Sequence, residues 1–189
     1  AQGTFGLHNR GSIASSPSIV VTNDSTFDLS KSALPFGGAM TVVLGDDANG
    51  SGALILGGNI VSNLSALTLN SANLTFSVTN ATLANINVGT LNLGDRSIAS
   101  SLNITALPAT VGLIQFPIIK YTSASGTYNL NLSTLPPGFS ANLINNTGNK
   151  SIDLQITQLA PGVWNGGNAG VDSNWSDALN WSGTALSGQ

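Results

Sequence analysis

Cysteine is absent from this 189-residue chain, and Lys, Arg, Asp and Glu together make up only 7% of it, where about 25% is usual. Without cysteine there is no disulfide framework, iron–sulfur cluster or thiol chemistry. One histidine and few carboxylates leave little for acid–base or nucleophilic catalysis. A net charge of −3 without a basic cluster offers nothing to attract nucleic acid or an anionic membrane. The composition therefore predicts that the chain is not an enzyme and binds neither nucleic acid nor membrane.

Long hydrophobic runs are also absent, and none approaches the roughly 18 residues of a membrane-spanning helix. The first residues lack the basic and apolar regions of a secretory signal. We therefore expect either a mature exported chain or one unit of a longer protein. Hydrophobic residues nevertheless make up 41% of the sequence, enough to form a buried core.

Apolar residues alternate with Thr, Ser or Asn in short runs that end at Gly, Asn or Ser, and helical periodicity is almost absent. Because successive side chains of a strand point to opposite faces, each run presents one apolar row. The pattern predicts an all-β chain, with strands that include 41–44, 53–56, 66–69, 74–78, 86–88, 90–93 and 102–104.

Two all-β architectures fit these strands. A β-sandwich or jelly roll joins strands of about five or six residues through hairpins, whereas a parallel β-helix stacks coils of short strands. We favour a right-handed parallel β-helix with about twenty residues per coil, and the sandwich is the alternative. Stacked like charges would repel, whereas amide side chains can form ladders between coils. The asparagines available for a ladder are Asn59, Asn63, Asn70, Asn73, Asn80, Asn85, Asn87 and Asn92.

Longer strands follow Pro108, and we interpret them as antiparallel strands that close one end of the stack. These strands cover 111–121, 126–132, 140–145 and 151–157. Beyond residue 160 the chain is rich in Gly, Asn and Ser and contains all three tryptophans. The sequence thus divides into N-terminal strands or a cap (1–40), β-helical coils (41–107), closing β-strands (108–159) and a Trp-rich tail or start of a next module (160–189).

Two segments resemble a known group of proteins. Residues 126–157, including Pro136-Pro137-Gly138-Phe139, are similar to the closing region of bacterial secreted surface proteins with autotransporter-associated β-strand repeats. The tail, with Trp164-Asn165-Gly166-Gly167, Asn174-Trp175 and Asn180-Trp181, resembles the opening motif of modules in the same proteins. The resemblance implies an exported, β-helical, structural or adhesive chain at the cell surface, usually one part of a long array.

Two oxygen-rich loops are candidate calcium sites, because Ca²⁺ takes six to eight oxygen ligands. The first contains Asp46, Asp47 and Asn49 on a Gly-rich turn, and the second contains Asp172, Asn174 and Asp177. Neither loop matches the EF-hand spacing. A plain turn is the favoured interpretation of the first loop, and no other cofactor is expected.

The three tryptophans of the tail, Trp164, Trp175 and Trp181, are the candidate interface residues. An exposed apolar patch of that size usually marks an interface, although tryptophans can also fold back onto their own domain. We therefore predict a non-catalytic extracellular structural unit of a surface fibre or array, which associates end to end with its own copies or adjacent modules. The alternative is a carbohydrate-binding or adhesin domain of a secreted surface protein, with Trp175 and Trp181 stacking on sugar rings.

Overall fold

The computed structural model describes residues 2–13, 15–33, 38–46, 50–58, 62–94, 98–108, 114–158, 163–164 and 180–182. The described residues form strands and turns, which confirms the all-β prediction, and they include no helix long and apolar enough to cross a membrane. The strands are β1 (Thr4–Asn9), β2 (Ser18–Val21), β3 (Ser25–Ser32), β4 (Thr41–Leu44), β5 (Gly52–Ile55), β6 (Ser62–Leu69), β7 (Ala72–Ser77), β8 (Ile86–Asn92), β9 (Ser100–Ala106), β10 (Gln115–Ser125), β11 (Leu130–Thr134), β12 (Ser140–Asn146), β13 (Ser151–Gln158), β14 (Val163–Trp164) and β15 (Trp181–Ser182).

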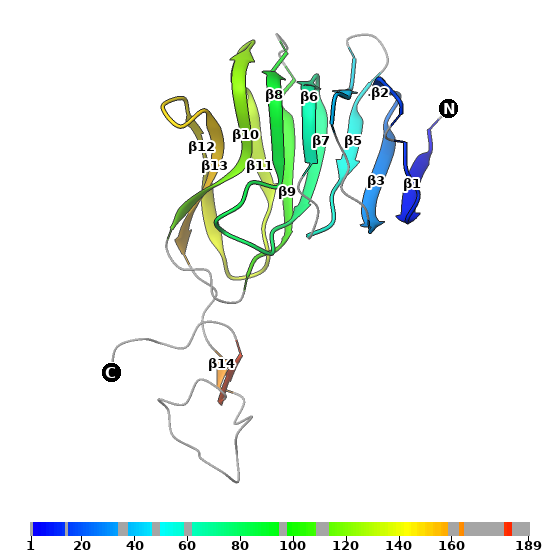
Figure 1. Ribbon diagram of the computed structural model, residues 1–189. Coiled ribbons are helices and arrows are strands. Elements are labelled where there is room, and N and C mark those ends of the chain that lie inside the picture. The colour runs from blue at the N-terminus through cyan, green and yellow to red at the C-terminus, as the bar shows by residue number, and fades with distance from the viewer. Residues whose placement is uncertain are drawn as a thin grey trace.

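Consecutive strands alternate between two sheets along most of the chain (Figure 1). One sheet has six strands in the order β1-β3-β5-β7-β9-β11, and all its pairs are parallel. The other has seven strands in the order β12-β13-β10-β8-β6-β4-β2, and is parallel from β10 to β2. We call each pair of consecutive strands from β1–β2 to β9–β10, one strand in each sheet, a layer.

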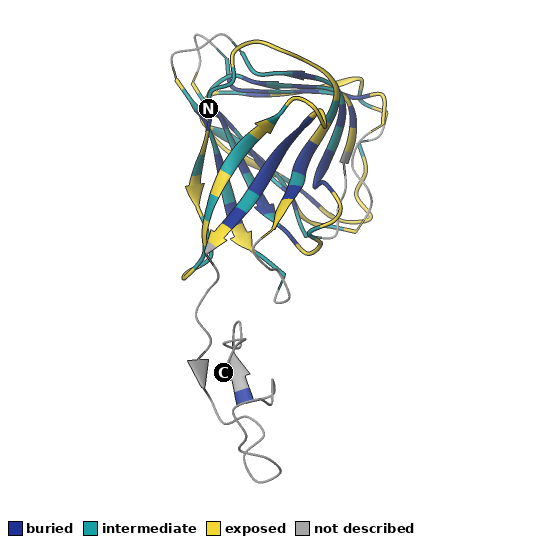
Figure 2. Cartoon of the chain, turned by 90° about the vertical axis from the view of Figure 1, so that its left-hand side faces the viewer, coloured by how far each residue is buried: buried dark blue, intermediate teal, exposed yellow. Residues whose placement is uncertain are grey.

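The core lies between the two sheets and consists of apolar files that run from layer to layer. In the six-stranded sheet, Phe27, Leu54, Leu74 and Leu102 are neighbours in register. Their exposed fractions are 0 or 1%. Buried residues occur on strands of both sheets (Figure 2). The predicted apolar rows of these strands therefore face the core, and each row is covered by the rows of neighbouring layers.

Glycine is required where the strands of the seven-stranded sheet end and the chain turns. Gly45, Gly94 and Gly126 follow β4, β8 and β10, and their φ values are 75°, 67° and 82°. A Cβ atom at Gly45 would lie 1.7 Å from the carbonyl oxygen of Asn70, and one at Gly126 would lie 2.6 Å from that of Gly94. The turns therefore stack so closely that a side chain would collide with the neighbouring backbone.

The two ends of the molecule differ. At the end farther along the chain, β13 pairs antiparallel with β10, and β12 pairs antiparallel with β13. These strands confirm part of the predicted antiparallel closure, but β10 and β11 pair in parallel with β8 and β9. At the opposite end, β1 and β2 are the outermost strands of their sheets.

The number of residues between neighbouring strands of one sheet varies from layer to layer. Gly52 pairs with Ala72 in the six-stranded sheet, whereas Ile86 pairs with Ile119 in the seven-stranded sheet. The estimate of about twenty residues per coil therefore fits the step from Gly52 to Ala72 but is too short for the step from Ile86 to Ile119. The connections differ in length while the strands remain in register, because loops tolerate insertions better than paired strands do.

Candidate functional site

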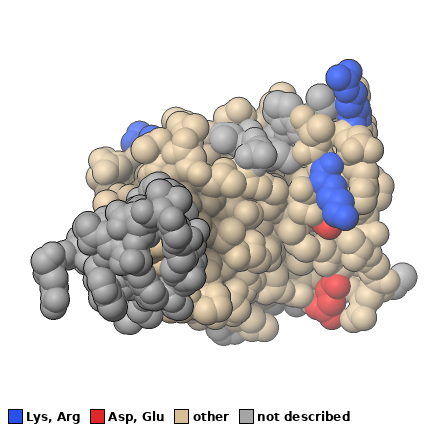
Figure 3. Space-filling view, turned by 90° about the horizontal axis from the view of Figure 1, so that it is seen from below, with Lys and Arg blue, Asp and Glu red and all other residues tan. Residues whose placement is uncertain are grey.

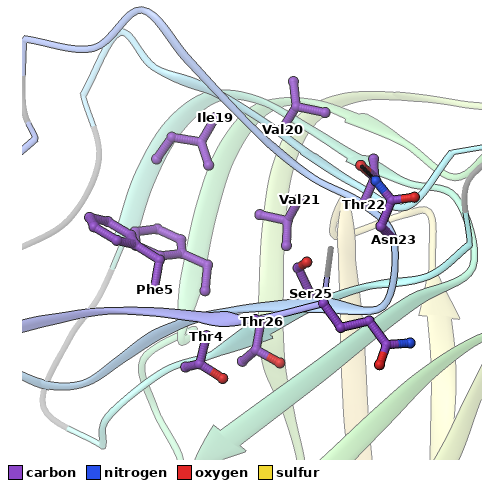
Figure 4. A pocket seen from close by; sticks show the side chains of 12 residues that line it. Thr4, Phe5, Ile19, Val20, Val21, Thr22, Asn23, Ser25 and Thr26 are labelled. Atoms are coloured by element: carbon purple, nitrogen blue, oxygen red, sulfur yellow. Dashed lines mark hydrogen bonds between the residues drawn. The ribbon is translucent and has the colours of Figure 1, made fainter.

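The space between the two sheets opens at the end formed by β1 and β2. A cavity of about 520 Å³, which we call the N-terminal cavity, lies there between β2 on one side and β1 and β3 on the other (Figure 4). Phe5, Ile19 and Val21 point into it, and Val20 points away from it. It is lined by Gln2, Gly3, Thr4, Phe5, Ile19, Val20, Val21, Thr22, Asn23, Ser25, Thr26 and Phe27.

The apolar lining of this cavity is uncovered because the cavity lies at the last layer of the stack. Phe5 stacks on Phe27, with ring centroids 5.7 Å apart and ring planes inclined by 19°. Phe27 is covered on both sides and is 1% exposed, whereas Phe5 is 56% exposed. The N-terminal cavity therefore presents side chains of core type to solvent, and such surfaces commonly mark interaction sites.

A row of polar side chains, the first polar ladder, connects successive layers along the six-stranded sheet. The Ser51 backbone N–H and hydroxyl both donate to Asp24 Oδ1, at 3.0 and 2.9 Å. These hydrogen bonds hold the pKa of Asp24 below its ordinary value. The ladder comprises Gln2, Asp24, Ser51, Asn73 and Ser101.

The second polar ladder belongs to the seven-stranded sheet. Asn92 Nδ2 donates to Thr68 Oγ1 at 3.2 Å, and Ser125 Oγ donates to Asn92 Oδ1 at 2.7 Å. The predicted stacking of polar side chains is therefore present, but the asparagines of the two ladders, Asn73 and Asn92, bond to hydroxyl groups and not to other amides. Asn63 and Asn87 are in register with each other, so two of the predicted asparagines do occupy neighbouring layers.

Charged side chains are sparse on the surface, as Figure 3 shows for the face seen from below. The most buried described carboxylate is Asp153 on β13, which is 4% exposed. Gln115 Nε2 and Asn146 Nδ2 each donate to Asp153 Oδ2 at 2.8 Å. Burial acts to raise the pKa of Asp153, but hydrogen bonding by the Ser151 side chain, these two hydrogen bonds and the positive charge of Lys120 hold it below its ordinary value. This carboxylate therefore joins β10, β12 and β13 at the closing end of the sheet.

The two predicted calcium loops lie mostly outside the described residues. Asp46 is described, and its backbone N–H donates to the Gly50 carbonyl oxygen at 3.2 Å, as in a closed turn. Asp47 and Asn49 lie outside the described residues, as do all three candidates of the second loop, Asp172, Asn174 and Asp177. In the described part of the chain, no group of three or more His, Cys, Asp or Glu residues is placed to hold a metal ion. The calcium sites stay predictions.

Two of the three predicted interface tryptophans are brought together. Trp164 and Trp181 are directly opposite each other in the antiparallel pair β14–β15, whereas Trp175 lies outside the described residues.

The N-terminal cavity was not predicted from the sequence. Its signal was present in two short strands without Asp, Glu, Lys or Arg, 4–9 and 18–21, whose apolar residues are Phe5, Leu7, Ile19, Val20 and Val21.

The chain matches no protein-family model, and no curated protein or solved structure is detectably similar to it. The two sheets, the polar ladders and the two ends of the molecule are therefore the features that bear on its function.

Proposed function

We propose that this chain is a non-catalytic extracellular structural unit of a surface fibre or tandem array, built as a right-handed parallel β-helix. The observation that carries the proposal is the alternation of strands between two sheets, in which each strand from β1 to β9 pairs in parallel with the strand two positions later. Parallel strands joined through a crossover are right-handed in nearly all known cases. Such a rod repeats one interface along its length, as stacked repeat proteins do.

The same repetition suits a mechanical role. Backbone hydrogen bonds, apolar files and polar ladders all run along the direction in which the layers stack. Every strand between the outermost strands of a sheet is paired on both sides, so opening one of them breaks backbone hydrogen bonds to two neighbours. The export and surface location follow from the resemblance of residues 126–157 and of the tail to surface proteins with autotransporter-associated repeats.

End-to-end association is assigned to the Trp-rich tail, residues 160–189. Tryptophan buries a large apolar area and is enriched at protein interfaces. The pairing of Trp164 with Trp181 brings two of the three tryptophans to one place in the chain. The partners are neighbouring copies of this chain or adjacent modules of the same protein.

Light scattering and electron microscopy of the full chain as a function of concentration test this proposal. The variant Trp164→Ser/Trp175→Ser/Trp181→Ser should lose assembled species, and the control Leu83→Ser/Ile98→Ser, which replaces apolar residues that are 56% and 59% exposed, should keep them. Unchanged assembly in the tryptophan variant would exclude the tail as the contact.

A carbohydrate-binding or adhesin domain is the second candidate, favoured by the hydroxyl and amide rows of the polar ladders. Such rows present hydrogen-bonding groups at the regular spacing of neighbouring strands, about 4.8 Å. This function predicts a monomer that is retained on an immobilised polysaccharide, and retention that decreases in Trp175→Ala. A monomer that no polysaccharide retains would contradict both candidates.

A further inference from the structure

The outer face of the seven-stranded sheet carries a regular array of small, uncharged side chains. Its first row crosses the five strands from β2 to β10, and each member pairs in register with the next: Ser18, Thr41, Ala66, Thr90 and Ser123. The residues two positions later on the same strands, from Val20 to Ser125, form a second row in the same register. We call these two rows the outer array.

Both rows of the outer array point away from the core. The residues that lie between the two rows on β4, β6 and β8 are Val42, Leu67 and Leu91, and each is 0% exposed. Because successive side chains of a strand point to opposite faces, the residues on either side of them face outward. On β2, Val20 points away from the N-terminal cavity and Ile19 points into it (Figure 4). Every residue of the outer array is exposed or partly exposed.

The outer array repeats without interruption in two directions. No register shift occurs in the four parallel pairs that join β2 to β10, whereas the pairs β1–β3, β7–β9 and β9–β11 of the six-stranded sheet each contain one. Neighbouring strands lie about 4.8 Å apart, and alternate residues of one strand lie about 6.6 Å apart. Hydroxyl, amide and methyl groups therefore recur at fixed intervals both along and across the strands.

Hydrogen bonds within the outer array hold several of its side chains in place. The hydroxyl oxygens of Thr90 and Ser123 are 3.2 Å apart and share a hydrogen bond. Asn92 bonds to both Thr68 and Ser125 in the second polar ladder. Side chains that are already ordered lose little conformational entropy when they bind a surface. The array is thus arranged before any contact is made.

We propose that the outer array binds the surface of ice crystals. Ice is an uncharged solid whose oxygen atoms repeat in two directions, and the repeats on its prism faces are close to those of the array. Water molecules bonded to the hydroxyl and amide groups, and packed against the methyl groups of Ala66, Val20 and Val43, would continue the ice lattice onto the protein. The array contains no Asp, Glu, Lys or Arg, and a strongly hydrated group such as the lysine ammonium would interrupt that lattice.

The two-dimensional repeat favours ice over other uncharged partners. A single polysaccharide chain would match the array along one direction only, whereas an ice face matches both. The outer face of the six-stranded sheet is a poorer match, because it carries Asp28 between the buried residues Phe27 and Leu29 and its register is interrupted. Ice binding by the outer array does not depend on the proposed function or on the Trp-rich tail.

Thermal hysteresis, the difference between the melting and freezing temperatures of a single ice crystal, tests this proposal in solutions of the full chain. The wild-type chain should produce hysteresis and faceted crystals. Thr90→Lys and Ser123→Lys each place a charge in the first row and should abolish both effects. The matched controls, Thr75→Lys and Asn131→Lys, lie on the six-stranded sheet and should keep them. Thr75 is partly exposed like Thr90, and Asn131 is exposed like Ser123.

Thermal unfolding followed by circular dichroism checks that each lysine variant is folded. Absence of hysteresis in the wild-type chain would overturn the proposal, as would equal hysteresis in the array variants and their controls. A chain without hysteresis that an immobilised polysaccharide retains, with retention lost in Thr90→Lys but not in Thr75→Lys, would assign the outer array to carbohydrate instead. Failure of the tail proposal has a different signature, because it appears as unchanged assembly in the tryptophan variant, in which the outer array is intact.

Discussion

At the scale of single residues, Gly45 shows how closely the turns of neighbouring layers approach. Gly45→Ala places a Cβ atom 1.7 Å from the Asn70 carbonyl oxygen at a φ of 75°. We expect the free energy of unfolding to fall by about 3 kcal/mol or more, from steric overlap added to the cost of a positive φ. Gly38→Ala is the matched control, because Gly38 also has a positive φ but no atom within 4 Å of an added Cβ. Gly38→Ala should lower the free energy of unfolding by only about 1–2 kcal/mol. Equal losses for the two variants in urea unfolding would contradict the close stacking of turns at Gly45.

Asp153 gives the molecule a pH dependence at the same scale. Its pKa is below the ordinary value in the folded chain despite burial, because hydrogen bonds from the side chains of Ser151, Gln115 and Asn146 and the charge of Lys120 favour the carboxylate. As the pH falls through the ordinary Asp pKa of about 3.9, the unfolded chain binds more protons than the folded chain, and stability decreases. This contribution is fully present above that pH and is lost as the pH falls through the folded-state pKa.

Asp153→Asn removes this titrating group. The variant should be less stable than the wild-type chain at neutral pH, and its thermal midpoint should change less between about pH 5 and pH 2. Scanning calorimetry of both proteins over this range measures the difference. Parallel curves for the two proteins would show that Asp153 contributes nothing to acid unfolding.

At the scale of the strand, the apolar files decide stability. Leu74 lies in the middle of the file formed by Phe27, Leu54, Leu74 and Leu102, and it is fully buried. Leu74→Ala should lower the free energy of unfolding by about 2–5 kcal/mol, because the neighbouring layers cannot close the cavity. Leu83→Ala removes the same atoms from a residue that is 56% exposed and should cost less than about 1 kcal/mol. Chemical denaturation measures the free energy of unfolding of both variants. Similar losses would show that Leu74 does not lie in the buried core.

Strands were the part of the fold that the sequence predicted best. The alternation in 41–44 and 66–69 corresponds to β4 and the end of β6, and the residues predicted to face one side are buried. The period of the layers could not be predicted, because connections of different length are compatible with the same register. The polar ladders were predicted as rows of amides, but register places Asn73 beside Ser101 and Asn92 beside Thr68. The N-terminal cavity was missed because exposure of Phe5 depends on the absence of a neighbouring layer, which no local pattern records.

At the scale of the whole molecule, charged residues make up only 7% of the chain, and the stacking of layers offers a physical reason for this low proportion. Residues of neighbouring layers lie directly opposite each other at about 4.8 Å, so one charged file would place like charges side by side along the sheet. Thr68 and Asn92 are such neighbours, and both are partly exposed. Their replacement by charged residues tests whether the scarcity of charge has this physical cause.

We expect the double variant Thr68→Asp/Asn92→Asp to lose about 0.5–1 kcal/mol more free energy of unfolding than the two single variants lose together. The additional loss is due to like-charge repulsion across the pair. Thr68→Asp/Asn92→Lys, at the same two positions, should show a coupling of the opposite sign. Both coupling energies should shrink when urea unfolding is repeated at about 1 M salt, where the Debye length is about 3 Å. Coupling of the same sign in both pairs would mean that side-chain shape, and not charge, limits what these layers accept. Coupling of opposite sign that salt reduces would explain why a chain built from stacked layers uses Asn, Ser and Thr where other surfaces use Lys and Glu.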